Sequence, residues 1–172
     1  MRSMTAQEAR EYCGQMGDSL QIAEDGSLSF DDEKSFSVQS PRDYRQLAFL
    51  SHSIAECAPQ GGLLWLHFFH GAENAIEVGW KIIEDMRKAV GDSSPLQVAP
   101  AQLFAESDAT ELQVVLMQVL GNGWGGYFVP STAPFAIGFR TSHQLFCYSD
   151  CEAEIEHMRS KFEAWTPKEV EI

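Results

Sequence analysis

Two histidines, His67 and His70, lie within the most apolar part of the chain, residues 61–71. Imidazole groups bind metal ions and act as general acids and bases, so their presence in this run raises both possibilities. The run is short, bounded by glycines, rich in aromatic residues and without helical spacing, which favours a strand over 63–70. Residues three apart in a strand point to opposite faces, so these two imidazoles cannot share a metal ion or a proton.

His70 is the better candidate of the two. It follows the predicted strand at its carboxyl end and precedes a helix whose first turn contains Glu73 and Asn74. Ligand sites gather at such strand ends and helix N-termini favour anions, although Glu73 opposes an anion here. We therefore expect His67 to be a hydrogen-bonded core residue. We treat His70 as a weak catalytic candidate and Asn74 as a weak ligand-binding candidate.

A second group of metal-binding residue types lies near the C-terminus, with the spacing His143-x3-Cys147-x3-Cys151-x5-His157. These residue types suit zinc, but the geometry does not. Four residues of extended strand separate His143 from Cys147 by about 13 Å, too far for ligands of one ion. Six residues of helix turn Cys151 away from His157. We therefore predict no metal site, and no cofactor.

Cys151 is the cysteine best placed to be a nucleophile, because we expect it at a helix N-terminus, where the helix dipole favours a thiolate. The neighbouring carboxylates of Asp150, Glu152 and Glu154 oppose that effect. Four scattered cysteines do not form a disulfide framework, so we expect reduced thiols. Cys151 and His143 join His70 as weak catalytic candidates.

The segment GNGWGG, residues 121–126, is rich in glycine but is not a phosphate-binding loop. No Lys-Ser or Lys-Thr follows it, and it precedes a strand and not a helix. We expect Gly121 to end a helix and Trp124 to pack against the core. The alternative is a flexible loop in which Trp124, a weak ligand-binding candidate, closes over a ligand or contacts a partner. The sequence contains no Ser-His-Asp signature, no HExxH motif and no dinucleotide fingerprint.

The elements that must position these residues alternate along the chain. A first helix is predicted over about 6–16, with Thr5 and Glu8 as a capping box, and a second from Ser40-Pro41 to Pro59. A third is predicted over about 73–90. A fourth is predicted over 109–120 with Asp108 as its cap, and a fifth from an Asp150 cap to Pro167. Strands are predicted in a hairpin around Asp25-Gly26, at 36–38, 63–70, 96–104, 127–130, 134–140 and 144–149. The prolines at 95 and 100 place the strand 96–104 at a sheet edge or at a bend.

This order predicts a single α+β domain over residues 1–166. We expect a mixed sheet of roughly six or seven strands, its outer strands antiparallel, with roughly four to five packed helices. A three-layer α/β arrangement is the alternative. Residues 167–172 are expected to be a mobile tail.

The charge balance limits the choice of partner. The 172 residues include 12 basic and 25 acidic side chains, for a net charge of −13, which repels the phosphates of nucleic acids. No apolar run is long enough to cross a bilayer and no secretory signal is visible, so we expect a cytoplasmic protein without a membrane partner.

Two hypotheses about function follow. The predicted helix 109–120 is apolar nearly all round, so it is buried or lies in an interface. We therefore expect a non-enzymatic protein-interaction or self-associating module, a homo-oligomer or an acidic partner of a basic protein, or a domain of a larger assembly. The alternative is a small enzyme or ligand-binding protein with a cleft at the carboxyl end of 63–70, which uses His70 with Asn74, Trp124 and His143.

Overall fold

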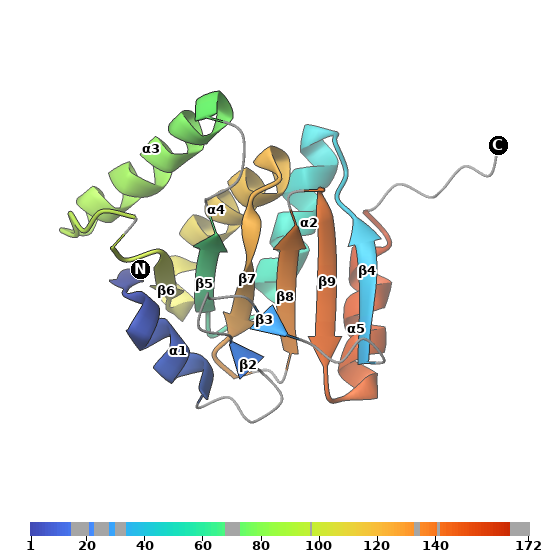
Figure 1. Cartoon of the computed structure of the whole chain (residues 1–172). Coiled ribbons are helices and arrows are strands. Elements are labelled where there is room, and N and C mark those ends of the chain that lie inside the picture. Colours follow the sequence, from blue (N-terminus) through green and yellow to red (C-terminus); the bar gives the residue numbers. More distant parts are fainter. Residues whose placement is uncertain are drawn as a thin grey trace.

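The computed structural model describes residues 1–14, 21–22, 28–29, 34–67, 73–96, 98–132, 135–140 and 142–165. Seven strands form one sheet in the order β1-β6-β5-β7-β8-β9-β4 (Figure 1). Their bounds are Arg2–Met4 (β1), Ser35–Gln39 (β4), Gly62–His67 (β5), Ala101–Phe104 (β6), Gly125–Pro130 (β7), Phe135–Arg140 (β8) and Gln144–Ser149 (β9). The predicted hairpin is confirmed by a separate antiparallel pair, Gln21–Ile22 (β2) with Leu28–Ser29 (β3).

Five helices are described: Ala6–Gly14 (α1), Tyr44–Glu56 (α2), Glu73–Ala89 (α3), Ala109–Asn122 (α4) and Glu152–Phe162 (α5). A short 3-10 turn, Glu106–Asp108, precedes α4. Helices α2, α4 and α5 cover one face of the sheet, and α1 lies on the opposite face (Figure 1). The α+β prediction is therefore confirmed.

The central strands are apolar on both faces because helices cover both. In β7, Phe128 packs into the larger core with α2, α4 and α5, while Tyr127 and Val129 pack into a smaller core with α1. Leu63 and Leu64 of β5 alternate between the two cores in the same way. A strand buried on both sides appears in the sequence as a continuous apolar run, which is why residues 63–67 carry no alternating pattern.

Helix α4 packs between α2 and α3, which explains its unusually apolar sequence (Figure 1). Its buried residues are Leu112, Val115, Leu116, Val119 and Leu120. The prediction left open whether this helix is buried inside the chain or lies between chains. These five side chains are buried within the chain, and only the side of α4 that carries Val114 faces outward.

All neighbouring strands in the described sheet are antiparallel, whereas the sequence predicted some parallel pairs. The helical connection from β4 to β5 joins strands that are not neighbours. After α3 the chain re-enters the sheet at the same end of the strands at which it left, since Ala101 at the start of β6 pairs with Trp65 near the end of β5. The sequence predicted that the strand around 96–104 lies at a sheet edge or contains a bend. Strand β6 is not at the edge, because β1, which was not predicted, pairs with its outer side.

The helix caps differ from the predictions in three places. Asp43, not Ser40, caps α2, because its carboxylate accepts hydrogen bonds from the backbone of Arg45 and Gln46. Ser40 instead donates its backbone N–H to His143 O at the end of β4. By contrast, the capping box of α1 is confirmed by reciprocal hydrogen bonds between Thr5 and Glu8.

The other two differences lie at the end of α4 and at the start of α5, whereas Asp108 is the N-cap residue of α4 as predicted. Helix α4 continues to Asn122 and ends at Gly123 in the left-handed conformation, and Gly121 lies inside the helix. The Asp108 side chain makes no cap hydrogen bond to α4 and accepts one from Ala105 N. Cys151, not Asp150, occupies the N-cap of α5.

Candidate functional site

His67, Trp124 and His143 lie at one end of the strands, the end shown at the top of Figure 1, whereas Cys151 follows β9 at the opposite end. His67 ends β5 and pairs with Gly125 at the start of β7, so the carboxyl end of β5 lies beside the residue that follows Trp124. His143 precedes β9 at the same edge. The backbones of His67, Trp124 and His143 therefore lie at the same end of the strands.

His143 is held in a tight turn between β8 and β9. It has a φ of 59°, in the left-handed region that residues other than glycine seldom adopt. Its Nδ1 lies 3.2 Å from Leu120 O in the last turn of α4, and its own carbonyl accepts hydrogen bonds from Ser40 N and from the Gln39 side chain. These contacts join β4, α4 and the β8–β9 turn, which gives His143 a structural role.

Trp124 is buried, with 6% of its surface exposed, and belongs to the core beneath the helices. Its backbone N–H donates to Val119 O, closing the end of α4 together with Gly123. The expectation that Trp124 packs against the core is confirmed. A side chain in this position connects α4 to β7 and does not face a ligand from solvent.

His70 lies outside the described residues, so its role stays a prediction. Asn74 lies in the first turn of α3, but its side chain is also outside the described part of the structure.

Cys151 is the only exposed thiol among the four cysteines, all of which are described and free. Its backbone carbonyl accepts hydrogen bonds from Glu154 N and Ile155 N at the start of α5. Burial raises the pKa of the Cys13 thiol to about 12 and that of Cys147 well above its usual value, which makes these two thiols inert near neutral pH. No group of three or more His, Cys, Asp or Glu residues suited to a metal ion occurs among the described residues.

Arg87 is a buried cation that the sequence analysis missed. Only 1% of its surface is exposed, and burial lowers its pKa. Its guanidinium donates to the carbonyl oxygens of Ser94, Ala99 and Ala101. The guanidinium therefore holds the loop between α3 and β6 to the helix.

A small polar hollow opens beside Arg87. It is lined by Glu84, Arg87, Lys88, Asp92, Ser93, Ser94 and Pro95. Hydrogen bonds from Ser3 and Ser94 lower the pKa of Asp92 to about 2, and Lys88 forms ion pairs with Glu84 and Asp85. Since these charges already have partners within the chain, the hollow supports the loop and offers no group set apart for a ligand.

Exposed apolar side chains gather mainly on the outward side of α2 and α4. Three of the five large hydrophobic residues exposed in the described structure lie there: Tyr44 at 70%, Phe49 at 50% and Val114 at 39%. The two helices are neighbours, since Gln113 of α4 donates a hydrogen bond to Ala48 O of α2. We define the α2–α4 face by its exposed and half-buried residues: Tyr44, Arg45, Ala48, Phe49, His52, Gln113, Val114, Met117, Gln118 and Gly121.

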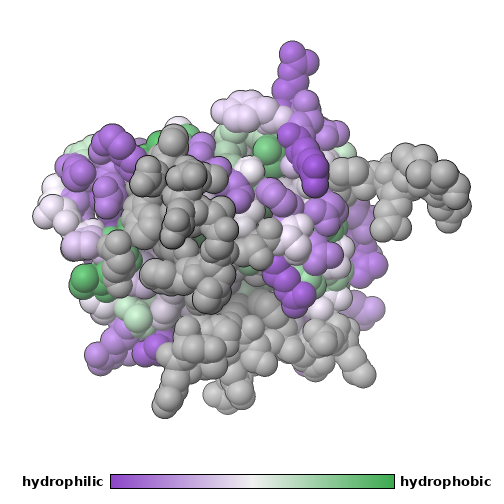
Figure 2. All heavy atoms as spheres, turned by 45° about the horizontal axis from the view of Figure 1, so that its top comes forward, coloured by the Kyte–Doolittle hydropathy of each residue, from purple (hydrophilic) through white to green (hydrophobic). Residues whose placement is uncertain are grey.

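Arg45 is the one formal charge among these ten residues, and the exposed Glu56 of α2 and Glu111 of α4 lie beside them, in a chain whose net charge is −13. Phe49 is stacked on Trp165 with ring centroids 4.6 Å apart, and the Trp165 indole donates to Ser53 Oγ, so the aromatic pair is held in place. Figure 2 shows the molecule from the front and the top of Figure 1. The described residues on that side are mainly hydrophilic, with small separate hydrophobic areas. The α2–α4 face is thus the described surface best suited to contact a partner. Its residues belong to two helices that are far apart in the sequence, so a motif analysis of the sequence could not identify it.

No family model matches the chain, and no curated protein or solved structure is similar enough to it to count as a match. The function is therefore inferred from the arrangement of the described residues. Within the described part of the chain, no helix combines the length and apolar composition needed to span a bilayer.

Proposed function

We propose that this protein acts by binding another protein through the α2–α4 face, and not by catalysis. The observation that carries the proposal is the concentration of exposed Tyr44, Phe49 and Val114 on two neighbouring helices, among mostly uncharged side chains. Tyrosine and phenylalanine are enriched in the cores of protein interfaces, and charged residues are depleted there.

The state of the aromatic residues supports the same proposal. Interface residues that contribute most to binding are rigid before the partner arrives, since ordering them on binding costs free energy. The stacking of Phe49 on Trp165, fixed by the hydrogen bond to Ser53, provides such a preformed contact.

The charge outside the face would contribute to specificity. Acidic side chains are plentiful elsewhere, with Glu152, Glu154 and Glu156 following one another along α5. Acidic surroundings repel other acidic proteins and favour a partner that is not acidic.

Site-specific photo-crosslinking in cells of the source organism tests this proposal. A benzophenone amino acid replaces Val114 on the face in one variant and Lys81, exposed on α3, in a matched control. We expect a discrete adduct from position 114 and none from position 81. A Phe49→Glu substitution should abolish that adduct, since it places a charge in the aromatic contact. Equal adducts from both positions, or an adduct that survives Phe49→Glu, would contradict the proposal.

A further inference from the structure

We infer that two copies of this chain pair antiparallel through the outer edges of their β4 strands, so that the two sheets become one. This surface is distinct from the α2–α4 face, and the inference does not depend on the proposed function.

Within its own five described residues, strand β4 carries none of the sequence features that usually protect an edge strand. Among the described strands it is the last of the sheet and pairs only with β9. Its sequence SFSVQ contains no charged residue and no proline, and its register with β9 continues through five residue pairs without a bulge. Natural proteins usually block edges with such charges, prolines or bulges, because open edges pair with other strands.

The opposite edge of the sheet provides a comparison within the same molecule. Strand β1 is only three residues long and carries the exposed Arg2. Short length and an exposed charge are two of the devices that prevent edge pairing. The two edges therefore differ in the property that matters, and β4 is the one suited to a strand partner.

The hydrogen-bond parity of β4 shows which backbone groups face outward. Ser40 donates its N–H to His143 O and continues the β4–β9 register, in which Val38 pairs with Leu145. Residues that exchange hydrogen bonds with one neighbour alternate with residues that face the other side. Ser37 and Gln39 therefore direct their backbone N–H and C=O groups to the outer edge.

The strand is complementary to itself about Ser37. In an antiparallel pair centred there, Ser37 lies opposite Ser37 of the second copy, and Phe36 lies opposite Val38. The small polar pair falls on one face of the joined sheet, while the apolar pair falls on the face that the helices cover. No like-charged side chains meet in this register, which is the arrangement that stabilises cross-strand pairs.

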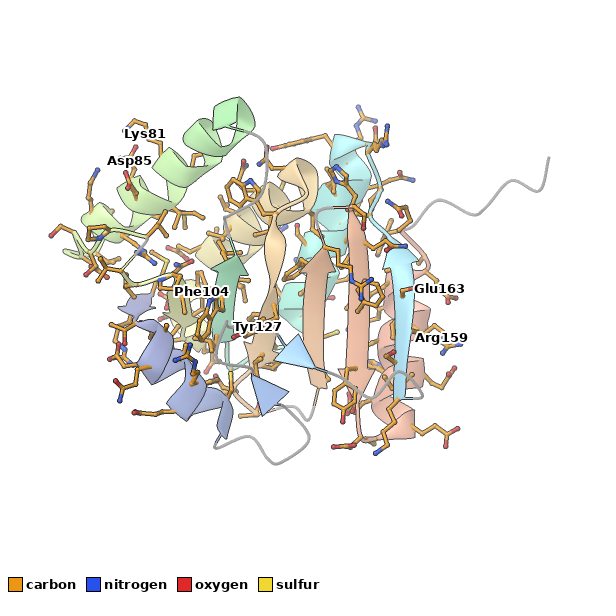
Figure 3. The ribbon with its side chains drawn as sticks, viewed as in Figure 1. Lys81, Asp85, Phe104, Tyr127, Arg159 and Glu163 are labelled. Atoms are coloured by element: carbon orange, nitrogen blue, oxygen red, sulfur yellow. The ribbon has the colours of Figure 1, made fainter. Side chains whose placement is uncertain are left out.

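Helix α5 packs against β4 and β9, so pairing through β4 brings the two α5 helices to the same interface. Arg159 lies with its guanidinium 5.3 Å from the Phe36 ring centroid, and Glu163 lies one turn further along α5. Figure 3 shows both residues on the β4 side of the molecule. A two-fold axis at Ser37 runs the two α5 helices antiparallel on the same side of the joined sheet.

The dimer would present both helical layers on the same side. Residues opposite one another in paired strands share a face, so α2, α4 and α5 of both copies lie on one side of the joined sheet. Two α2–α4 faces directed to the same side would let the dimer bind two sites of a partner at once, which raises the apparent affinity.

Sedimentation velocity of the full chain tests the inference, over concentrations from about 1 to about 200 µM. We expect the wild type to reach twice the 19.2 kDa mass of one chain.

A Ser37→Lys variant brings two like charges together at the axis and should weaken dimerisation by about tenfold or more. Ser37 is exposed, so the variant should fold normally, which its thermal unfolding checks. Thr110→Lys, exposed on α4, is the matched control with the same change of charge and should dimerise like the wild type.

A disulfide trap provides a second measurement. Opposed residues of a hydrogen-bonded antiparallel pair have Cα atoms about 5.5 Å apart, which a disulfide can bridge. In a Cys151→Ser background, Ser37→Cys should give a covalent dimer on mild oxidation, while Thr110→Cys should stay monomeric. A wild type that remains monomeric, or a dimer that Ser37→Lys does not weaken, would overturn the inference. A dimer lost with Phe49→Glu but kept with Ser37→Lys would assign self-association to the α2–α4 face.

Discussion

At the scale of single residues, polar groups that looked available for chemistry are used to hold the fold together. His143 and Trp124 both lie where α4 ends, and both are engaged with that helix through Leu120 O and Val119 O. Arg87 satisfies three backbone carbonyls of one loop. A motif search uses residue types and their spacing, but the hydrogen-bond partners of these side chains are separated from them in the sequence and are identified only from the folded structure.

His143 provides a residue-scale prediction. A non-glycine residue in the left-handed region costs roughly 1 kcal/mol, and the bond to Leu120 O returns a similar amount. His143→Gly should therefore leave the free energy of unfolding within about 0.5 kcal/mol of the wild type. His143→Val loses the bond and places a branched side chain at a φ of 59°, so it should destabilise the protein by about 2 kcal/mol or more.

Urea unfolding of both variants measures these differences. His157→Val, on an exposed position of α5, is the control and should stay within about 0.5 kcal/mol of the wild type. Equal stability of the Gly and Val variants at position 143 would show that the turn conformation is not under the constraint described.

At the scale of elements, periodicity identified the helices and strands well, and local choices among neighbouring residues were less well predicted. Ser40 and Asp43 are both good N-cap residues, so the sequence alone could not choose between them. In the structure Ser40 continues the β4–β9 register through its N–H bond to His143 O, and α2 begins after Asp43, whose carboxylate accepts from Arg45 N and Gln46 N. Similarly, Gly121 and Gly123 are both suitable helix ends, but only Gly123 takes the left-handed conformation that ends α4, and the Asn122 side chain donates back to Gln118 O.

Two glycines give an element-scale prediction with a matched control. A Cβ atom at Gly126 would lie 2.3 Å from Trp65 O, so Gly126→Ala must push β5 and β7 apart in the middle of the sheet. We expect it to destabilise the protein by about 3 kcal/mol. A Cβ atom at Gly121 would meet only the Leu47 side chain at 3.6 Å, and alanine favours a helix, so Gly121→Ala should stabilise by about 1 kcal/mol.

Chemical denaturation of the two variants checks the prediction. An unchanged stability for Gly126→Ala would mean that the β5 and β7 backbones are further apart than the register implies.

At the scale of the whole molecule, the sequence predicted the α+β class and about the right number of strands, because both follow from hydrophobic patterns within short windows. It did not predict strand order or direction. Those depend on which strands meet across the chain, as when Ser35–Gln39 pairs with Gln144–Ser149. It also missed β1, since three residues are too few for a pattern. The proposed contact face escaped notice for a similar reason, because α2 and α4 are far apart in the sequence and meet only in the folded chain, where Gln113 bonds to Ala48 O.

The net charge of −13 gives the whole-molecule prediction. Most ion pairs in the described structure lie between exposed side chains, such as Lys81 with Asp85, and contribute little stability. The excess of carboxylates is therefore the larger electrostatic effect, and it opposes the compact state by self-repulsion. Raising NaCl from about 20 to about 300 mM should increase the free energy of unfolding by about 1 kcal/mol, because salt screens that repulsion.

The size of this salt effect should follow the number of exposed carboxylates. Replacing Glu152 and Glu156 by Gln removes two acidic side chains from α5 and should reduce the increase, while replacing Lys81 by Gln should enlarge it. Urea midpoints for the three proteins at both salt concentrations measure the change. If salt instead lowers the stability of the wild type, the exposed ion pairs outweigh self-repulsion, and the acidic surface stabilises the fold through local pairs.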